Sequence, residues 1–254
     1  MTDLFDAHFH IFEPGFPMHE NNGYLPQPFT LSNYDTWRNN LHVCGGAVVS
    51  GSMQGFDTSY LLHALAHLGP GFVGVAQIPP SLTDEEILAL DREGVRAVRF
   101  NVRRGGSATL DQIEPLGQRV FDLAGWHVEL YIDAKDLPDL MPVLSGLPKA
   151  SIDHLGLSED GLPHLLRLVE RGVKVKATGF GRLDFDPLGA LRKIHDENPH
   201  ALMFGTDLPS TRAKRPFRVE DVDLVLDNFS TRDRARILRE NAAGFYGISL
   251  QCPA

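Results

Sequence analysis

The sequence contains only two cysteines, Cys44 and Cys252, among 254 residues. They lie far apart and form neither a disulfide framework nor a thiolate metal site, which favours a reducing compartment. Long apolar runs are also missing, and residues 1–12 carry acids where a secretory signal would carry basic residues. We therefore predict no membrane span, no targeting segment and a cytoplasmic location.

Basic residues are in the minority. The chain has 24 Lys and Arg against 33 Asp and Glu, a formal net charge of −9. Such a surface does not attract a polyanion, so we predict no nucleic-acid partner. With 43% hydrophobic and 22% charged residues, the chain is long enough to bury a core, and its length fits a single barrel domain over residues 1–254.

Short apolar runs rich in β-branched residues alternate with longer amphipathic stretches that end at glycine. This alternation is typical of βα units and a parallel sheet. Eight runs predict a closed α/β barrel of the TIM type. The predicted strands are 4–12, 44–52, 72–78, 95–102, 127–132, 150–154, 173–177 and 201–207.

Local signals mark helix ends and one long loop. Thr83 and Glu86 have the spacing of a capping box, and a second helix over 58–68 should end at Gly69. The segment 14–29 contains four prolines and an Asn-Asn-Gly turn, so we predict an irregular loop there.

Polar residues recur at every second position within several predicted strands. Because barrel strands are buried on both faces, this alternation predicts a polar barrel interior and mouth. Half-exposed antiparallel strands would show the same pattern, but the intervening helices disfavour them. The interior set comprises Asp6, His8, His10, Arg99, Asn101, Arg103, Glu129, Tyr131, Asp133, Lys174, Lys176 and Thr178.

Four residues are expected to meet at the carboxyl end of the barrel, where barrel active sites lie. His8 and His10 project the same way from the first strand, His154 ends the sixth, and Asp207 ends the eighth, next to the first. A carboxylate among imidazoles can bind a metal, act as a general base, or do both. Asp153 has the opposite alternation from His154 and is expected behind the site or toward a helix.

Several motifs together resemble the amidohydrolase superfamily, in its "amidohydrolase 2" branch. They are Asp-Ala-His-Phe-His-Ile-Phe at 6–12, Ile-Asp-His-Leu-Gly at 152–156 and Phe-Gly-Thr-Asp-Leu-Pro at 204–209. Within that branch, three further motifs are similar to lactonases grouped with 2-pyrone-4,6-dicarboxylate lactonase. These are Gln-Gly-Phe-Asp at 54–57, Val-Arg-Phe-Asn at 98–101 and Gly-Trp-His-Val-Glu-Leu-Tyr at 125–131.

The resemblance implies a distorted (β/α)8 barrel, a single domain that opens the lactone ring of a small carboxylated compound. Asp207 would be the base that deprotonates water, and His8, His10 and His154 would polarise the carbonyl and stabilise the oxyanion. Substrate-binding positions would be Ser52, Arg99, Tyr131 and Arg182, with Arg103 or Arg104 as a further anion contact.

Two departures from this group concern the anion contacts. Leu157 stands where the dicarboxylate lactonase carries an arginine, so the substrate is expected to differ. The loop after Asp207 offers Arg212, Lys214 and Arg215, which either bind an acidic group or form a solvated turn.

The resemblance leaves metal content open between one divalent ion and none. His8, His10 and Asp207 would hold a single Zn²⁺ with an open position, as in many relatives. A binuclear site is not expected, because the fourth strand has no bridging lysine and His127 lies at the wrong end of the fifth.

Three functions follow from these expectations. The leading one is a lactone hydrolase acting on a small anionic substrate. A mononuclear zinc-dependent decarboxylase of the same superfamily is the first alternative, and a non-catalytic binding barrel is the second. A homo-oligomer is compatible with all three.

Overall fold

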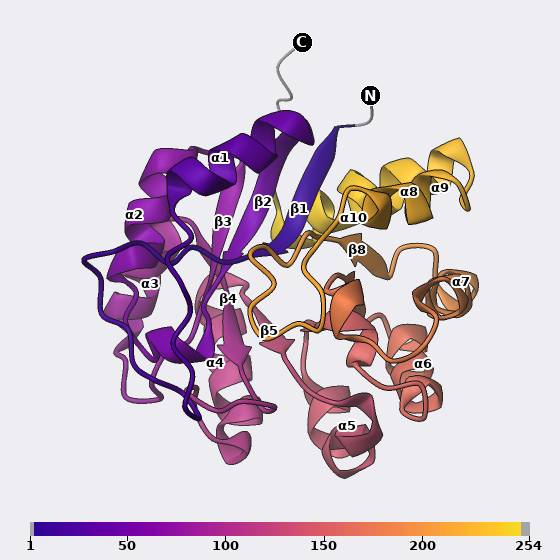
Figure 1. Ribbon diagram of the computed structural model, residues 1–254. Helices are drawn as coiled ribbons and strands as arrows, with labels where there is room; N and C mark the ends of the chain where they lie inside the picture. Colours follow the sequence, from indigo (N-terminus) through magenta and orange to yellow (C-terminus); the bar gives the residue numbers. More distant parts are fainter. Residues whose placement is uncertain (1–2, 250–254) are drawn as a thin grey trace.

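The computed structural model describes residues 3–249; Cys252 lies outside this range. Eight parallel strands form one sheet in sequence order and are surrounded by helices, which confirms the predicted α/β barrel (Figure 1). Each predicted run overlaps one strand. The strands are β1 (Leu4–Phe9), β2 (Val43–Val49), β3 (Phe72–Ala76), β4 (Val95–Phe100), β5 (His127–Leu130), β6 (Ala150–Ile152), β7 (Lys174–Ala177) and β8 (Leu202–Phe204).

Helices connect successive strands and continue beyond the last one. They are α1 (Leu31–Asn40), α2 (Ser59–Leu68), α3 (Asp84–Arg92), α4 (Ile113–Ala124), α5 (Leu137–Gly146), α6 (Leu162–Glu170), α7 (Pro187–Glu197), α8 (Glu220–Leu226), α9 (Thr231–Ala235), the π-helical turn η6 (Arg236–Glu240) and α10 (Asn241–Tyr246). Within residues 3–249, no helix has the length and apolar character needed to cross a bilayer.

The predicted local signals are confirmed. Thr83 and Glu86 form a reciprocal capping box at the start of α3, and α2 ends at Gly69. The segment 14–29 contains no helix or named strand, only isolated bridges that pair Phe12 with Phe29 and Asn21 with Tyr24.

The barrel closes between β8 and β1 through a few specific contacts. The backbone of Asp207 donates to the carbonyl of His8 at 2.7 Å, and His10 donates to the carbonyl of Leu208 at 2.8 Å. Gly205 makes this approach possible, because a Cβ there would lie 2.6 Å from the backbone nitrogen of His8. Only glycine at position 205 therefore allows β8 to approach β1 closely enough to close the barrel.

Asp6 does not face the barrel interior, so its predicted orientation is wrong. Its carboxylate accepts hydrogen bonds from the backbone and hydroxyl of Thr206 and from the hydroxyl of Tyr34 on α1. The cause is a register shift between β1 and β2 after Asp6, which interrupts the simple alternation of side chains. Phe5 takes the interior position instead and stacks on Tyr246 of α10.

The barrel interior is polar on one side only, so the predicted polar interior is confirmed for only part of the barrel. Buried polar side chains come from β4 to β7, whereas β1 to β3 contribute mostly apolar ones. The apolar side packs on α10, which lies next to β1 and β8 (Figure 1). The interior apolar cluster comprises Phe5, Ala7, Ala47, Val49, Val73, Val75, Ala97, Met203, Ala242, Ala243, Phe245 and Tyr246. The buried charged groups of the interior are thus concentrated on the β4 to β7 side.

Replacing Gly205 with alanine should destabilise the protein by about 3 kcal/mol, because the new methyl group would overlap the β1 backbone. Urea unfolding gives the free energy. Gly244→Ala in α10 is the matched control, since nothing lies within 4 Å of its Cβ position. A Gly205→Ala protein as stable as the control would contradict this account of closure.

Candidate active site

Three histidine rings surround one carboxylate oxygen at the carboxyl end of the barrel. The Nε2 atoms of His8, His10 and His154 lie 4.0, 3.9 and 4.0 Å from Oδ1 of Asp207. All four residues are buried. The structure therefore brings together the four residues that the sequence pointed to, from the ends of β1, β6 and β8.

The backbone turns after β6 and β8 set the directions of the His154 and Asp207 side chains. His154 and Asp207 have positive φ angles of 52° and 60°, a region that non-glycine residues rarely occupy. Gly179 after β7 also has a positive φ of 62°, and a Cβ there would lie 2.7 Å from Nδ1 of His154. These turns reflect the local backbone path, which strand periodicity does not describe.

The imidazoles of His10 and His154 each have a close polar neighbour at Nδ1. Nδ1 of His10 lies 2.7 Å from the carbonyl of Val49 on β2, and since a carbonyl can only accept, this nitrogen carries the proton. Nδ1 of His154 lies 2.7 Å from the hydroxyl of Thr178. Burial and nearby arginines lower the pKa of His10 to about 3 and the pKa of His154 well below its usual value. The rings are therefore neutral at pH 7.

Arg182 forms a bidentate ion pair with Asp207. Its Nε and Nη2 donate to the two carboxylate oxygens at 2.7 and 2.9 Å, and its Nη1 donates to the carbonyl of Thr211 at 2.9 Å. Arg182 ends the 3₁₀ turn η5 (Phe180–Arg182) after β7. Burial raises the pKa of Asp207, whereas the ion pair with Arg182 acts in the opposite direction.

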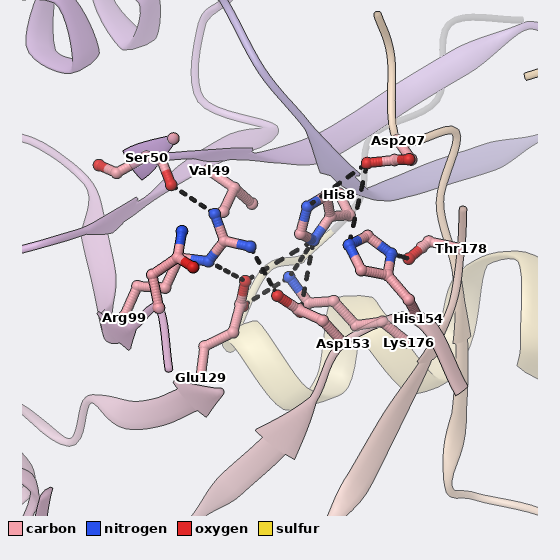
Figure 2. Close-up of polar contacts among 12 residues, drawn as sticks. His8, Val49, Ser50, Arg99, Glu129, Asp153, His154, Lys176, Thr178 and Asp207 are labelled. Carbon is pink, nitrogen blue, oxygen red and sulfur yellow. Dashed lines mark hydrogen bonds and ion pairs between the residues drawn. The ribbon is translucent and has the colours of Figure 1, made fainter. Parts of the chain in front are cut away.

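A second set of charges lies behind His8 (Figure 2). Arg99 donates to Asp153 at 2.7 Å and to the carbonyl of Ser50, while Nζ of Lys176 lies 2.5 Å from Oε2 of Glu129. With Arg182 and Asp207, the buried centre thus holds three cations and three anions, a balance that limits the cost of burial.

Of the two positions expected for Asp153, behind the site or toward a helix, the structure shows the first: its Oδ1 lies 3.4 Å from Nδ1 of His8 inside the barrel. Arg99 borders the inner chamber described below and is bound to Asp153 and Ser50. Its role as a substrate contact stays a prediction.

Two neighbouring cavities lie at the carboxyl end of the barrel. The inner chamber has a volume of about 30 Å³ and includes His10, Ser52, Arg99, His154 and Arg182 in its wall. It has room for about one water molecule. The outer cavity, of about 590 Å³, is lined in part by Arg103, Leu157, Lys214, Asp133 and Asp160. Both cavities share four wall residues, namely Arg104, Tyr131, Arg182 and Arg212.

Arg212 joins the loop 14–29 to this boundary. Its guanidinium donates to the carbonyl and side-chain oxygens of Asn21 and lies 4.5 Å from the centre of the Tyr24 ring. Asn21 in turn donates to the carbonyl of Arg104 at 3.1 Å. Arg215, from the same basic run, pairs instead with Asp221. In the basic run after Asp207, Arg212 therefore lies at the site, whereas Arg215 stabilises the surrounding fold.

The potential metal-ligand atoms of His8, His10 and Asp207 all lie within 4.8 Å of one another, as do those of His8, Asp153 and His154. Such clusters could hold a metal ion. However, each oxygen of Asp207 already accepts a hydrogen bond from Arg182, so an ion would compete with a buried guanidinium for this carboxylate. We derive no step through a metal.

The fold and the site together define the class of protein. It is a parallel barrel in which histidines and an aspartate from the ends of the first, sixth and eighth strands meet at one point. The chain belongs to the amidohydrolase family, whose model matches residues 5–248. This confirms the resemblance drawn from the motifs.

Similar proteins place the chain more closely within that family. It is 35% identical over 156 residues to a 2-pyrone-4,6-dicarboxylate hydrolase of Comamonas testosteroni, a match that spans 59% of the chain and only 51% of that relative. It is 28% identical to a 4-sulfomuconolactone hydrolase of Hydrogenophaga intermedia, over 95% of the chain and 88% of the relative.

A solved Pseudomonas putida structure, provisionally described as a 2-pyrone-4,6-dicarboxylic acid hydrolase, has a TM-score of 0.83 and 28% identity. The match covers 99% of this chain and 100% of that one. The barrel is therefore shared along its whole described length.

Replacing Arg182 with glutamine should increase zinc affinity about tenfold or more, because it frees both oxygens of Asp207 beside His8 and His10. Titration calorimetry on the folded variant measures this. Arg192→Gln is the control, since Arg192 contacts Asn228 on the outside of the barrel. Tight zinc binding by the unaltered protein would show that Arg182 does not block the metal.

Proposed function

We propose that the protein is a hydrolase that opens the ring of a lactone, a cyclic ester of a small carboxylated compound. The observation that carries the proposal is the position of Asp207 Oδ1, about equally far from three buried imidazole Nε2 atoms. The two curated relatives support it, because both are named as hydrolases of small ring compounds, one of them a lactone.

In the proposed mechanism, Asp207 is the general base. A water molecule beside its Oδ1 attacks the ester carbonyl carbon and transfers a proton to the carboxylate. Nε2 of His10 is an acceptor, because its Nδ1 is bound to Val49, so it would orient the same water. Hydrogen-bond donors among the remaining imidazoles would stabilise the oxyanion. Collapse then breaks the ring C–O bond, and the ring oxygen takes up the proton that Asp207 accepted from water, which restores the carboxylate.

An anionic substrate is supported by an excess of cations around the outer cavity. Its wall holds six cations, Arg103, Arg104, Lys135, Arg182, Arg212 and Lys214, against four carboxylates, Asp133, Glu159, Asp160 and Asp184, although the protein as a whole is negative. Guanidinium groups suit carboxylates, which they bind in a bidentate manner. Ser52 and Tyr131 remain proposed substrate contacts at the inner chamber. A ring compound exceeds about 30 Å³, so the residues between the two cavities must move to admit it.

A zinc-dependent decarboxylase remains the alternative, favoured by the proximity of the ligand atoms of His8, His10 and Asp207. It would release carbon dioxide, whereas a lactonase releases acid without loss of carbon. A non-catalytic binding barrel would do neither. A cytoplasmic location, the lack of a nucleic-acid partner and assembly into a homo-oligomer remain predictions.

Asp207→Asn should lower kcat for lactone hydrolysis about 10²- to 10⁴-fold, because an amide cannot accept the proton of water. A pH indicator that follows acid release from a panel of carboxylated lactones measures the rate. Asp160→Asn is the control, since Asp160 is an exposed residue of the outer cavity. Near-native turnover by Asp207→Asn would remove Asp207 from the proposed role.

Arg212→Gln should raise KM about tenfold with a much smaller effect on kcat, because it removes a charged contact from the entry to the site. Arg215→Gln, three residues further along the same loop, should leave KM near its native value, since Arg215 pairs with Asp221. Steady-state kinetics decide between them. Equal KM values in the two variants would argue against a binding role for Arg212.

A further inference from the structure

Lys176 on β7 is a fully buried lysine that the mechanism above does not use. Its Nζ lies 2.5 Å from Oε2 of Glu129, which also accepts a hydrogen bond from the hydroxyl of Tyr246 at 3.2 Å. The same Nζ lies 3.4 Å from Nδ1 of His8. Figure 2 shows His8 between this group and Asp207. The ammonium therefore contacts the side of the ring that faces away from Asp207.

The chemistry of the two groups fixes the direction of this hydrogen bond. An ammonium can only donate, so Nδ1 of His8 must accept. A neutral imidazole has one proton, which then lies on Nε2. Oδ1 of Asp153 lies at the same distance, 3.4 Å, from Nδ1, but it makes no hydrogen bond with any residue of the described range 3–249.

His10 is held in the opposite form. Its Nδ1 donates to the carbonyl of Val49 at 2.7 Å, which leaves Nε2 with a lone pair. The rings of His8 and His10 are 5.0 Å apart, and the Nε2 atoms of both face Oδ1 of Asp207. One ring thus presents a donor and the other an acceptor to the same point.

We propose that Lys176 is a positioning residue whose ammonium holds the proton of His8 on Nε2, so that His8 donates to the substrate carbonyl. The proposal rests on the proposed lactone hydrolysis for the identity of that carbonyl. In the reaction, Nε2–H of His8 hydrogen-bonds the carbonyl oxygen, and this bond strengthens as the oxygen becomes negative. The proton stays on His8, and Lys176 never contacts the substrate.

The experiment compares three variants with the unaltered protein. Lys176→Met keeps the length of the side chain and removes the donor, but it leaves the buried Glu129 carboxylate without its cation. Lys176→Met with Glu129→Gln removes both charges and serves if the single variant does not fold. Glu129→Gln alone keeps Lys176 and is the matched control. ¹⁵N NMR of histidine-labelled protein reports which ring nitrogen of His8 is protonated, and loss of the signal in His8→Gln assigns it.

We expect Nε2-protonated His8 in the unaltered protein and in Glu129→Gln, and Nδ1-protonated His8 in both variants that lack Lys176. We also expect kcat to fall about 10- to 100-fold in those two variants with little change in KM. A proton on Nδ1 in the unaltered protein, or an unchanged His8 form without Lys176, would overturn the proposal. The NMR result does not depend on turnover, so failure of the lactonase proposal would remain distinguishable.

Discussion

The ion pair between Arg182 and Asp207 is the interaction on which the site depends. It fixes one carboxylate oxygen among three imidazoles and connects the turn after β7 to the turn after β8. Because Arg182 also donates to the backbone beyond Asp207, it helps to hold the segment that closes the barrel. The same contact engages both oxygens of Asp207, so a metal ion would have to compete with it. One guanidinium thus links closure of the fold to the chemistry available at its mouth.

The barrel interior separates charge from apolar packing. The β1 to β3 side, with α10, forms an apolar cluster, while β4 to β7 carry the buried charges. Arg99 with Asp153, and Lys176 with Glu129, form close pairs behind His8. Burying such pairs gains little stability in itself. Both pairs border the His8 ring, which is the basis of the positioning role proposed for Lys176, since each pair has little freedom to rearrange in a packed interior.

The sequence was sufficient to predict the eight strands and the meeting of His8, His10, His154 and Asp207, because apolar runs and strand ends follow from regular periodicity. It failed where the backbone departs from that periodicity. A register shift turned Asp6 outward. The engagement of Arg182 with Asp207 was also missed, since nothing in strand alternation indicates which cation pairs with which anion.

Asp207 is thus proposed as a general base held by Arg182 and not as a metal ligand. The most direct test is to measure lactone turnover per protein chain in preparations whose metal content has been varied by chelation and zinc addition and then determined. The account predicts a rate that does not depend on bound metal. A rate that rises in proportion to one bound zinc ion per chain would contradict it.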